Sequence, residues 1–290
     1  MKKLEKITNY VLNTILSIFA IAGIWLFLQV FIFTSFRIPS DSMAPELEAG
    51  DCVLVNKLIL GPRLFDLSAS MQGEQVEIYR VPGFKSIERN NILVFNFPHP
   101  HTWEKIEMHL MKYYIKRCIG LPGDTLSIEN GIYQIKNCPI TSGNLKSQQR
   151  IRRRAVDSFE EGVFRSFPYD TILNWNIKDF GPLYIPKAGT TITMDRTHFC
   201  FYRKIIEWEQ KGALSYHDST VYLNDIPLKE YQFQKNYYFM AGDNGENSQD
   251  SRYWGFLPEE YIVGKATRIW KSVDLGSGKW RWERVLKRIE

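Results

Sequence analysis

A short segment of the chain reads Pro39-Ser40-Asp41-Ser42-Met43-Ala44-Pro45. Each proline fixes its own φ, lacks an N–H group and biases the residue before it toward extended geometry, so we expect an extended rather than a helical segment. An extended backbone would place the Ser40 and Ser42 hydroxyls on the same side, with free backbone N–H groups nearby. A serine nucleophile needs an exposed hydroxyl, backbone donors for an oxyanion and a nearby base. Taken alone, the segment fits either such a site or a Ser/Pro linker that leaves a membrane.

The residues before this segment form a long apolar stretch. No Asp, Glu, Lys or Arg occurs from Ile7 to Phe36, and the run from Tyr10 to Phe33 is longer than the ~20 apolar residues needed to cross a bilayer. Ala20-Ile21-Ala22 resembles a signal-peptide cleavage site, but the strongest apolar run lies beyond it, whereas cleavage sites follow the apolar region. The stretch therefore predicts an uncleaved transmembrane anchor over residues 7–36.

Charges on either side of the anchor predict its orientation. Lysines precede the apolar stretch, whereas Arg37 is followed by several acidic residues, namely Asp41, Glu46, Glu48 and Asp51. Because Lys and Arg are retained on the cytoplasmic side, we expect residues 1–6 in the cytoplasm and the remaining ~250 residues outside it.

Composition narrows the class of protein. The chain has 290 residues, enough for one substantial domain or two small ones. The net charge of +5 is modest and spread out, which gives nucleic-acid binding little support. None of the four cysteines forms a CxxC pair, so no disulfide scaffold is expected, although one disulfide is left open. His99 and His101 lie in a proline-rich loop without ligand-spaced neighbours, so neither a metal nor another cofactor is expected.

Strand signals fill most of the remaining chain. Asn130-Gly131, between two strand-like runs, predicts a hairpin. Other apolar runs bounded by turn residues predict strands at 52–57, 92–97, 111–119, 237–241 and 262–270. The basic cluster at 150–154 is interpreted as a solvated face, with contact to anionic lipid as the alternative.

The fold class that follows is mainly β. We expect an N-terminal transmembrane helix, followed by an extracytoplasmic β-rich domain that contains an inserted subdomain. The expected boundaries are 1–6 for the cytoplasmic N-terminus, 7–36 for the anchor, 37–136 and 235–272 for the catalytic β core, 137–234 for an inserted β-rich subdomain and 273–290 for a basic and aromatic tail.

Four segments behind the anchor carry a resemblance to a known family. They are Ser42, Gly50-Asp51, Lys116-Arg117-Cys118-Ile119-Gly120-Leu121-Pro122-Gly123-Asp124 and Asn247-Ser248-Gln249-Asp250-Ser251-Arg252-Tyr253-Trp254-Gly255. The set, in this order, resembles bacterial type I signal peptidases, which are serine peptidases with a Ser/Lys dyad. By this resemblance Ser42 is the nucleophile and Lys116 the general base. A lysine with a reference pKa of ~10.4 must be tuned to roughly 7–8 for that task.

The resemblance also implies supporting roles around the dyad. Ser40 would donate its side chain to the oxyanion together with the backbone N–H of Ser42. Ser248 would orient the base through a hydrogen bond, and Asp250 with Arg252 would form the ion pair that fixes this loop.

The implied substrates are preproteins that bear a signal peptide with small residues at −1 and −3. The segment would lie beside strand edges, so that main-chain hydrogen bonds give affinity and two shallow pockets give specificity. Positions that match the family's pocket lining are Ile38, Pro39, Met43, Leu47, Tyr114 and Ile115. The implied setting is the lipid bilayer of the cell (inner) membrane, with a single span, a periplasmic catalytic domain and proximity to the secretion translocon.

Three positions depart from the family pattern. Glu46 stands where Thr is usual and places a carboxylate near the serine, Gly245-Glu246 replaces Arg-Asp, and Asn90-Asn91 replaces Gly-Asp. Two alternatives therefore stay open: an inactive scaffold or adaptor of the secretion route, and a peptidase dedicated to one substrate such as a pilin. The anchor argues against the self-cleaving cytoplasmic repressor peptidases, and the lack of a lysine three residues after Ser42 argues against penicillin-recognising enzymes.

Overall fold

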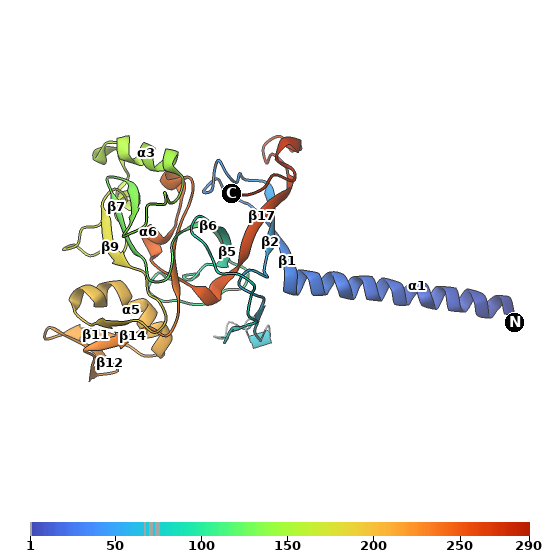
Figure 1. The fold of residues 1–290 in the computed structure, drawn as a ribbon, viewed down its shortest axis with the longest axis horizontal. Helices are drawn as coiled ribbons and strands as arrows, with labels where there is room; N and C mark the ends of the chain where they lie inside the picture. The colour runs from blue at the N-terminus through green and yellow to red at the C-terminus, as the bar shows by residue number, and fades with distance from the viewer. Residues whose placement is uncertain (1, 67, 70–71, 73–75) are drawn as a thin grey trace.

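The N-terminal helix projects from a β-rich body. A computed structural model of the chain describes residues 2–66, 68–69, 72 and 76–290. Helix α1, Lys2–Phe27, continues into a π-helical turn, Leu28–Ile32 (Figure 1). Within the described part of the chain, one helical segment, Glu5–Ile32, is long and apolar enough to cross a membrane.

The helical segment passes directly into the main sheet. Residues Phe33–Arg37 form strand β1, which pairs antiparallel with β2, Asp51–Asn56, so the expected anchor over 7–36 is too long at its C-terminal end. Phe and Thr favour strands, and pairing with β2 satisfies the backbone groups that a continued helix would otherwise satisfy. The Lys57 Nζ also donates to the carbonyls of Gln29 and Val30, at 2.8 and 3.1 Å. The helix is therefore joined to the body by strand pairing rather than by a free linker.

The main sheet has seven strands in the order β1-β2-β17-β5-β6-β15-β16. Its further strands are β17 (Ile262–Ser272), β5 (Ile92–Asn96), β6 (Tyr113–Gly120), β15 (Tyr237–Ala241) and β16 (Leu257–Pro258). The strands predicted from the apolar runs are thus present, with ends shifted by one or two residues. The prediction of a mainly β fold behind an N-terminal apolar helix is confirmed.

Smaller elements surround this sheet. The three-stranded sheets are β8 (Ile132–Ile135), β7 (Thr125–Glu129) and β9 (Phe180–Tyr184), and β11 (Leu214–His217), β12 (Thr220–Leu223) and β13 (Ile226–Pro227). The two-stranded sheets are β10 (Thr191–Thr193) with β14 (Glu230–Gln232), and β3 (Arg63–Leu64) with β4 (Tyr79–Arg80). Further α-helices in the described part of the chain include α3 (Leu145–Arg153), α4 (Glu161–Phe164), α5 (Arg196–Gln210) and α6 (Ser251–Trp254). Single 3-10 turns lie at Val156–Ser158, Gly245–Asn247, Glu259–Tyr261 and Trp282–Arg284.

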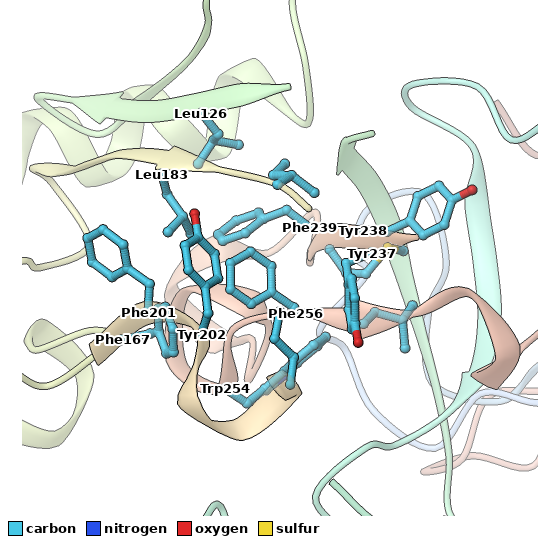
Figure 2. Packing of buried hydrophobic residues seen from close by; sticks show 14 of the residues in the cluster. Leu126, Phe167, Leu183, Phe201, Tyr202, Tyr237, Tyr238, Phe239, Trp254 and Phe256 are labelled. Carbon is cyan, nitrogen blue, oxygen red and sulfur yellow. The ribbon is translucent and has the colours of Figure 1, made fainter. Parts of the chain in front are cut away.

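The segment between β8 and β15 was expected to be β-rich, but it also contains α3 and α5. Side chains at their N-caps, Asn144 and Asp195, accept hydrogen bonds from backbone N–H groups of the first turn. The segment is not separated from its surroundings, because β7 pairs with β9 across the expected boundary at 137. Figure 2 shows Tyr202 of α5 and Phe239 of β15 in one hydrophobic cluster.

The C-terminal residues fold back onto the sheet instead of forming a free tail. Backbone hydrogen bonds join Leu286 to Ile269 and Ile289 to Thr267, and the Ile289 side chain is buried. The indole rings at 280 and 282 stack on each other and stay exposed.

Candidate active site

A cleft of about 290 Å³ opens between the end of β1 and the start of β6. Seven of the residues singled out in the sequence line it: Ile38, Pro39, Ser40, Ser42, Tyr114, Ile115 and Lys116. Its other lining residues are Phe36, Arg37, Val94, Tyr113, Asn247 and Gln249. Segments widely separated in sequence thus meet at one concave surface, the usual form of a binding site.

Ser42 and Lys116 lie side by side in this cleft. The Lys116 Nζ and the Ser42 Oγ are 2.7 Å apart, and both residues are buried, with 5% and 8% of their surfaces exposed. Lys116 is held inside strand β6, where it pairs with Leu93 of β5. Ser40 lies on the other side of the serine, with its Oγ 3.4 Å from the Ser42 Oγ.

The serine sits in a turn rather than in extended backbone. The Ala44 N–H donates to the Asp41 carbonyl at 3.0 Å, so the extended geometry expected for the whole of Pro39–Pro45 is wrong beyond Ser40. The Ser42 carbonyl accepts a hydrogen bond from the Asn244 N–H at 3.1 Å, which connects the turn to the loop after β15.

Burial is the main cause that lowers the pKa of Lys116 from its usual 10.5 to about 8. The Asp250 carboxylate opposes this shift, the Arg252 guanidinium adds to it and Asp243 opposes it again. The ring of Tyr114 lies beneath the ammonium group, 5.5 Å from Nζ to the ring centroid. Near neutral pH an appreciable fraction of this lysine is therefore an amine that can accept a proton.

Asp250 and Arg252 form a fully buried, bidentate ion pair behind the lysine. The Arg252 Nε and Nη2 donate to the two carboxylate oxygens, both at 2.8 Å, and the side chains are 0–1% exposed. Burial alone would raise the pKa of the Asp250 carboxyl, but the Arg252 guanidinium and the Gly242 N–H hold it below its usual range. The ion pair expected from the sequence is present.

Ser248 is close to the site but does not orient the lysine as expected. Its Oγ is buried and makes no hydrogen bond of normal geometry with Lys116 or any other residue that the structure describes, but its closeness to Asp250 helps to lower the pKa of that carboxyl. It packs against Gly242, where a Cβ would lie only 2.1 Å from the Ser248 Oγ and 2.5 Å from the Ser42 carbonyl oxygen. The glycine thus lets this loop approach the serine turn closely.

Two of the expected pocket residues do not reach the cleft. Met43 and Leu47 are fully buried and pack in the core with Val53 and Val55 of β2. The turn that directs Ser42 into the cleft directs these neighbouring side chains into the core, so they support the turn by packing beneath it.

A second buried ion pair, between Arg117 and Asp243, was not predicted from the sequence. The Arg117 Nε and Nη2 donate to the Asp243 carboxylate at 2.7 and 2.6 Å, on the opposite face of β6 from Lys116. Arg117 also donates to the Asn90 carbonyl at 2.9 Å. Adjacency to Lys116 and to Gly242 was the only signal in the sequence.

The carboxylate of Glu46 faces the C-terminal residues rather than the serine. It accepts hydrogen bonds from the Lys287 Nζ and the Glu290 N–H, each at 3.2 Å. The buried Asp51 is bonded nearby to Arg284 at 2.6 Å, and the Glu48 N–H donates to the same carboxylate at 2.9 Å. The acidic residues around the serine turn therefore hold this turn in place through contacts with the C-terminal residues.

Neither metal ligation nor disulfide bonding contributes to the described geometry. Among the residues that the structure describes, no group of three or more His, Cys, Asp and Glu side chains could hold a metal ion. All four cysteines are free thiols, so the disulfide left open by the sequence is not formed.

Comparison with known proteins gives one family. A family model described as "Signal peptidase, peptidase S26" matches residues 11–271. The signal peptidase I of Buchnera aphidicola subsp. Acyrthosiphon pisum is 31% identical over 287 residues, which cover 96% of this chain and 82% of that protein. The signal peptidase I of Pseudomonas aeruginosa is 29% identical over 266 residues, which cover 88% of this chain and 71% of that protein. With its N-terminal apolar helix, which indicates membrane anchoring, this chain belongs to the signal peptidase family, peptidase S26.

Proposed function

We propose that this peptidase removes N-terminal signal peptides from secreted preproteins, with Ser42 as nucleophile and Lys116 as general base. The single observation that carries the proposal is the buried 2.7 Å contact between the Lys116 Nζ and the Ser42 Oγ. A solvated lysine would be charged near neutral pH, but burial leaves part of the population as the free amine.

The chemistry follows from this geometry. The neutral Lys116 takes the hydroxyl proton while the Ser42 Oγ attacks the scissile carbonyl, which becomes a tetrahedral oxyanion. The Ser40 Oγ–H and the Ser42 N–H are the donors proposed for that oxyanion. The lysine then gives its proton to the leaving amine. Water hydrolyses the acyl-enzyme in a second round, with the same lysine as base, and restores the free serine.

The cleft favours an extended substrate with small side chains next to the cut. Ile38 and Pro39 after β1 and Tyr114 and Ile115 of β6 line the cleft beside the serine with apolar groups. The proposed specificity is cleavage after small residues at −3 and −1, with main-chain pairing to these two segments.

We propose that the anchor holds the site close to a membrane. Only five residues, those of β1, separate the helical segment from Ile38 at the cleft. We propose that the N-terminus is cytoplasmic, that the β-rich body is periplasmic and that the enzyme cleaves its substrates near the translocon in the inner membrane. Tethering of enzyme and substrate to one bilayer raises their effective concentration without any new contact.

Cleavage of a preprotein tests the function directly. Wild-type protein in detergent is expected to cut a secretory preprotein with an Ala-x-Ala site after the −1 alanine, as mass spectrometry of the new N-terminus will show. A matched preprotein with lysine at −1 should stay uncut. If the folded enzyme cleaved none of several preproteins, this result would favour the alternatives of a dedicated peptidase or an inactive scaffold.

The pH dependence tests the role of Lys116. Its folded-state pKa is lowered to about 8, so the amine fraction, and with it kcat/KM, should rise with pH and reach half of its plateau near pH 8. At pH 7 only about one tenth of the lysine would be neutral. Initial rates from pH 6 to 10 on a soluble signal-peptide substrate measure the curve. A half-maximum near pH 6.5, the range of a histidine, would contradict this assignment.

A further inference from the structure

Helix α3 contacts the loop that holds the ion pair behind Lys116. The Gly245 N–H donates to the Ser147 Oγ of α3 at 2.8 Å, and this hydrogen bond is buried. A Cβ on Gly245 would lie 2.9 Å from the Ile151 Cδ1, so the glycine allows α3 to lie this close. Figure 1 shows α3 beside this loop, although the two lie far apart in the sequence.

Charge reinforces the contact. The Glu246 carboxylate pairs with two arginines of the α3 segment, with the Arg150 Nε at 3.2 Å and with the Arg154 Nη1 at 3.3 Å. Arg152 and Arg153 of the same cluster are exposed, and neither forms an ion pair within the part of the chain that the structure describes. The basic cluster is therefore a solvated face, as expected, and two of its four arginines, Arg150 and Arg154, also hold Glu246.

A short series of contacts connects Gly245 and Glu246 to the proposed catalytic lysine. The Gly245 carbonyl accepts a hydrogen bond from the Arg252 Nη2 at 2.8 Å, and Arg252 forms the bidentate pair with Asp250. Both of these charges act on Lys116. The neighbouring Asn244 N–H donates to the Ser42 carbonyl at 3.1 Å, so the same loop also holds the serine turn.

An isolated surface ion pair would contribute little to such a connection. Here one carboxylate is shared by two guanidinium groups, and a buried hydrogen bond one residue away would leave an unsatisfied N–H if it were broken. Contacts within one such network couple by amounts equivalent to about tenfold in an equilibrium or a rate.

We propose that α3 is a positioning element of the reaction: Ser147, Arg150 and Arg154 hold Gly245-Glu246, and thereby keep the Asp250–Arg252 pair against Lys116. This inference rests on the proposed function. It assigns a role in the reaction to the segment between β8 and β15, and it gives the Gly245-Glu246 departure a partner inside the same chain.

A loosened contact between α3 and this loop would have a distinctive effect. The Tyr114 ring lies beneath Lys116, and Asp250, Arg252 and Asp243 are close enough to act on its charge. Water admitted to this buried position would restore part of the solvation that burial removes. The midpoint of the pH–rate curve should then move upward from about 8, so that activity lost at pH 7.5 is partly regained at pH 9.5. A uniform loss of folded protein would scale the whole curve without moving its midpoint.

Charge reversal in the full-length protein tests the proposal. Glu246→Arg, and separately Arg150→Glu with Arg154→Glu, should lower kcat at pH 7.5 about tenfold, with a smaller change in KM and an upward shift of the midpoint. The combination of all three substitutions restores opposite charges and should return kcat to within about threefold of wild type. The matched control is Arg152→Glu with Arg153→Glu, which makes the same charge change on the same helix and should leave kcat and the midpoint unchanged.

Each outcome separates this inference from the proposed function. Active wild type together with a Glu246→Arg variant of unchanged kcat and midpoint overturns the positioning role alone. The positioning role is also overturned if the folded Glu246→Arg variant and the folded triple variant lose the same amount of activity, because the restored ion pairs of the triple variant should restore kcat. Should Glu246→Arg not fold, Ser147→Ala gives the same readouts by removing only the buried hydrogen bond. A wild type that cuts no preprotein overturns the proposed function, and this role falls with it.

Discussion

Lys116→Met should lower kcat on a preprotein substrate by about 10³-fold or more, the scale found when one member of a catalytic unit is removed. The variant keeps an unbranched apolar side chain in the same buried position but has no group that can take the Ser42 proton. Lys116→Arg should be equally inactive, because a guanidinium stays charged at every pH at which the protein folds. Ser42→Ala should match both variants. Loss of activity in Lys116→Arg, which keeps the positive charge, would mean that Lys116 acts as the base rather than only as a positive charge.

The same substitution should not weaken the fold. A lysine pKa lowered from 10.5 to about 8 means that its charged form costs the folded state about 3 kcal/mol at pH values below 8. This cost disappears as the pH rises from 8 to 10.5, where the amine is neutral in both states. Lys116→Met removes the cost, so its melting temperature at pH 7 should equal or exceed that of wild type.

The control for this substitution is Lys112→Met, because Lys112 lies just before β6 and donates to the Pro100 carbonyl, away from the serine. It should cleave at a rate close to that of wild type. An active Lys116→Met would contradict the assignment of the base, and an unfolded one would contradict the expected melting temperature.

The sequence allowed the sheet to be predicted because its signals are local. Buried strands such as Tyr237–Ala241 are apolar runs bounded by turn residues, and the hairpin at Asn130-Gly131 needs only two residues with positive φ. The meeting of Ser42 with Lys116 was not a local signal. It followed from the order of motifs that resemble a family, and the structure places these two side chains in contact.

The misjudged residues depend on partners far away in the sequence. Glu46 was read as a carboxylate near the serine, but Lys287 is 241 positions away and draws it to the other side. Arg150 is exposed, as the sequence predicts, but its ion pair with Glu246 was not predicted, because the two residues are 96 positions apart. Met43 and Leu47 were assigned to the pocket because they match the family pattern, and only the turn at Ser42 decides that they face the core.

The second large effect is expected at the buried ion pair. Asp250→Asn leaves the Arg252 guanidinium at 1% exposure without its counter-ion, and loss of one partner of a buried pair costs about 3–5 kcal/mol. This cost corresponds to a fall in melting temperature of about 10 °C. Cleavage at pH 7.5 should fall as well, because the Arg252 side chain that holds the Gly245 carbonyl of this loop loses the carboxylate that fixes it. Asp218→Asn, at an exposed carboxylate, is the control and should change neither quantity.

A double variant separates the two contributions of the pair. Asp250→Leu with Arg252→Met removes both charges, and apolar replacement of a buried pair is often neutral or stabilising, so most of the lost melting temperature should return. Activity should not return with it, because the Gly245 carbonyl and the Gly242 N–H lose the partners that fix the loop at the serine turn. Thermal unfolding and initial rates of the same preparations measure both quantities. If activity recovered in parallel with stability, the pair would matter only for folding, and the connection from α3 to Lys116 would have to run through Asn244 and the Ser42 carbonyl instead.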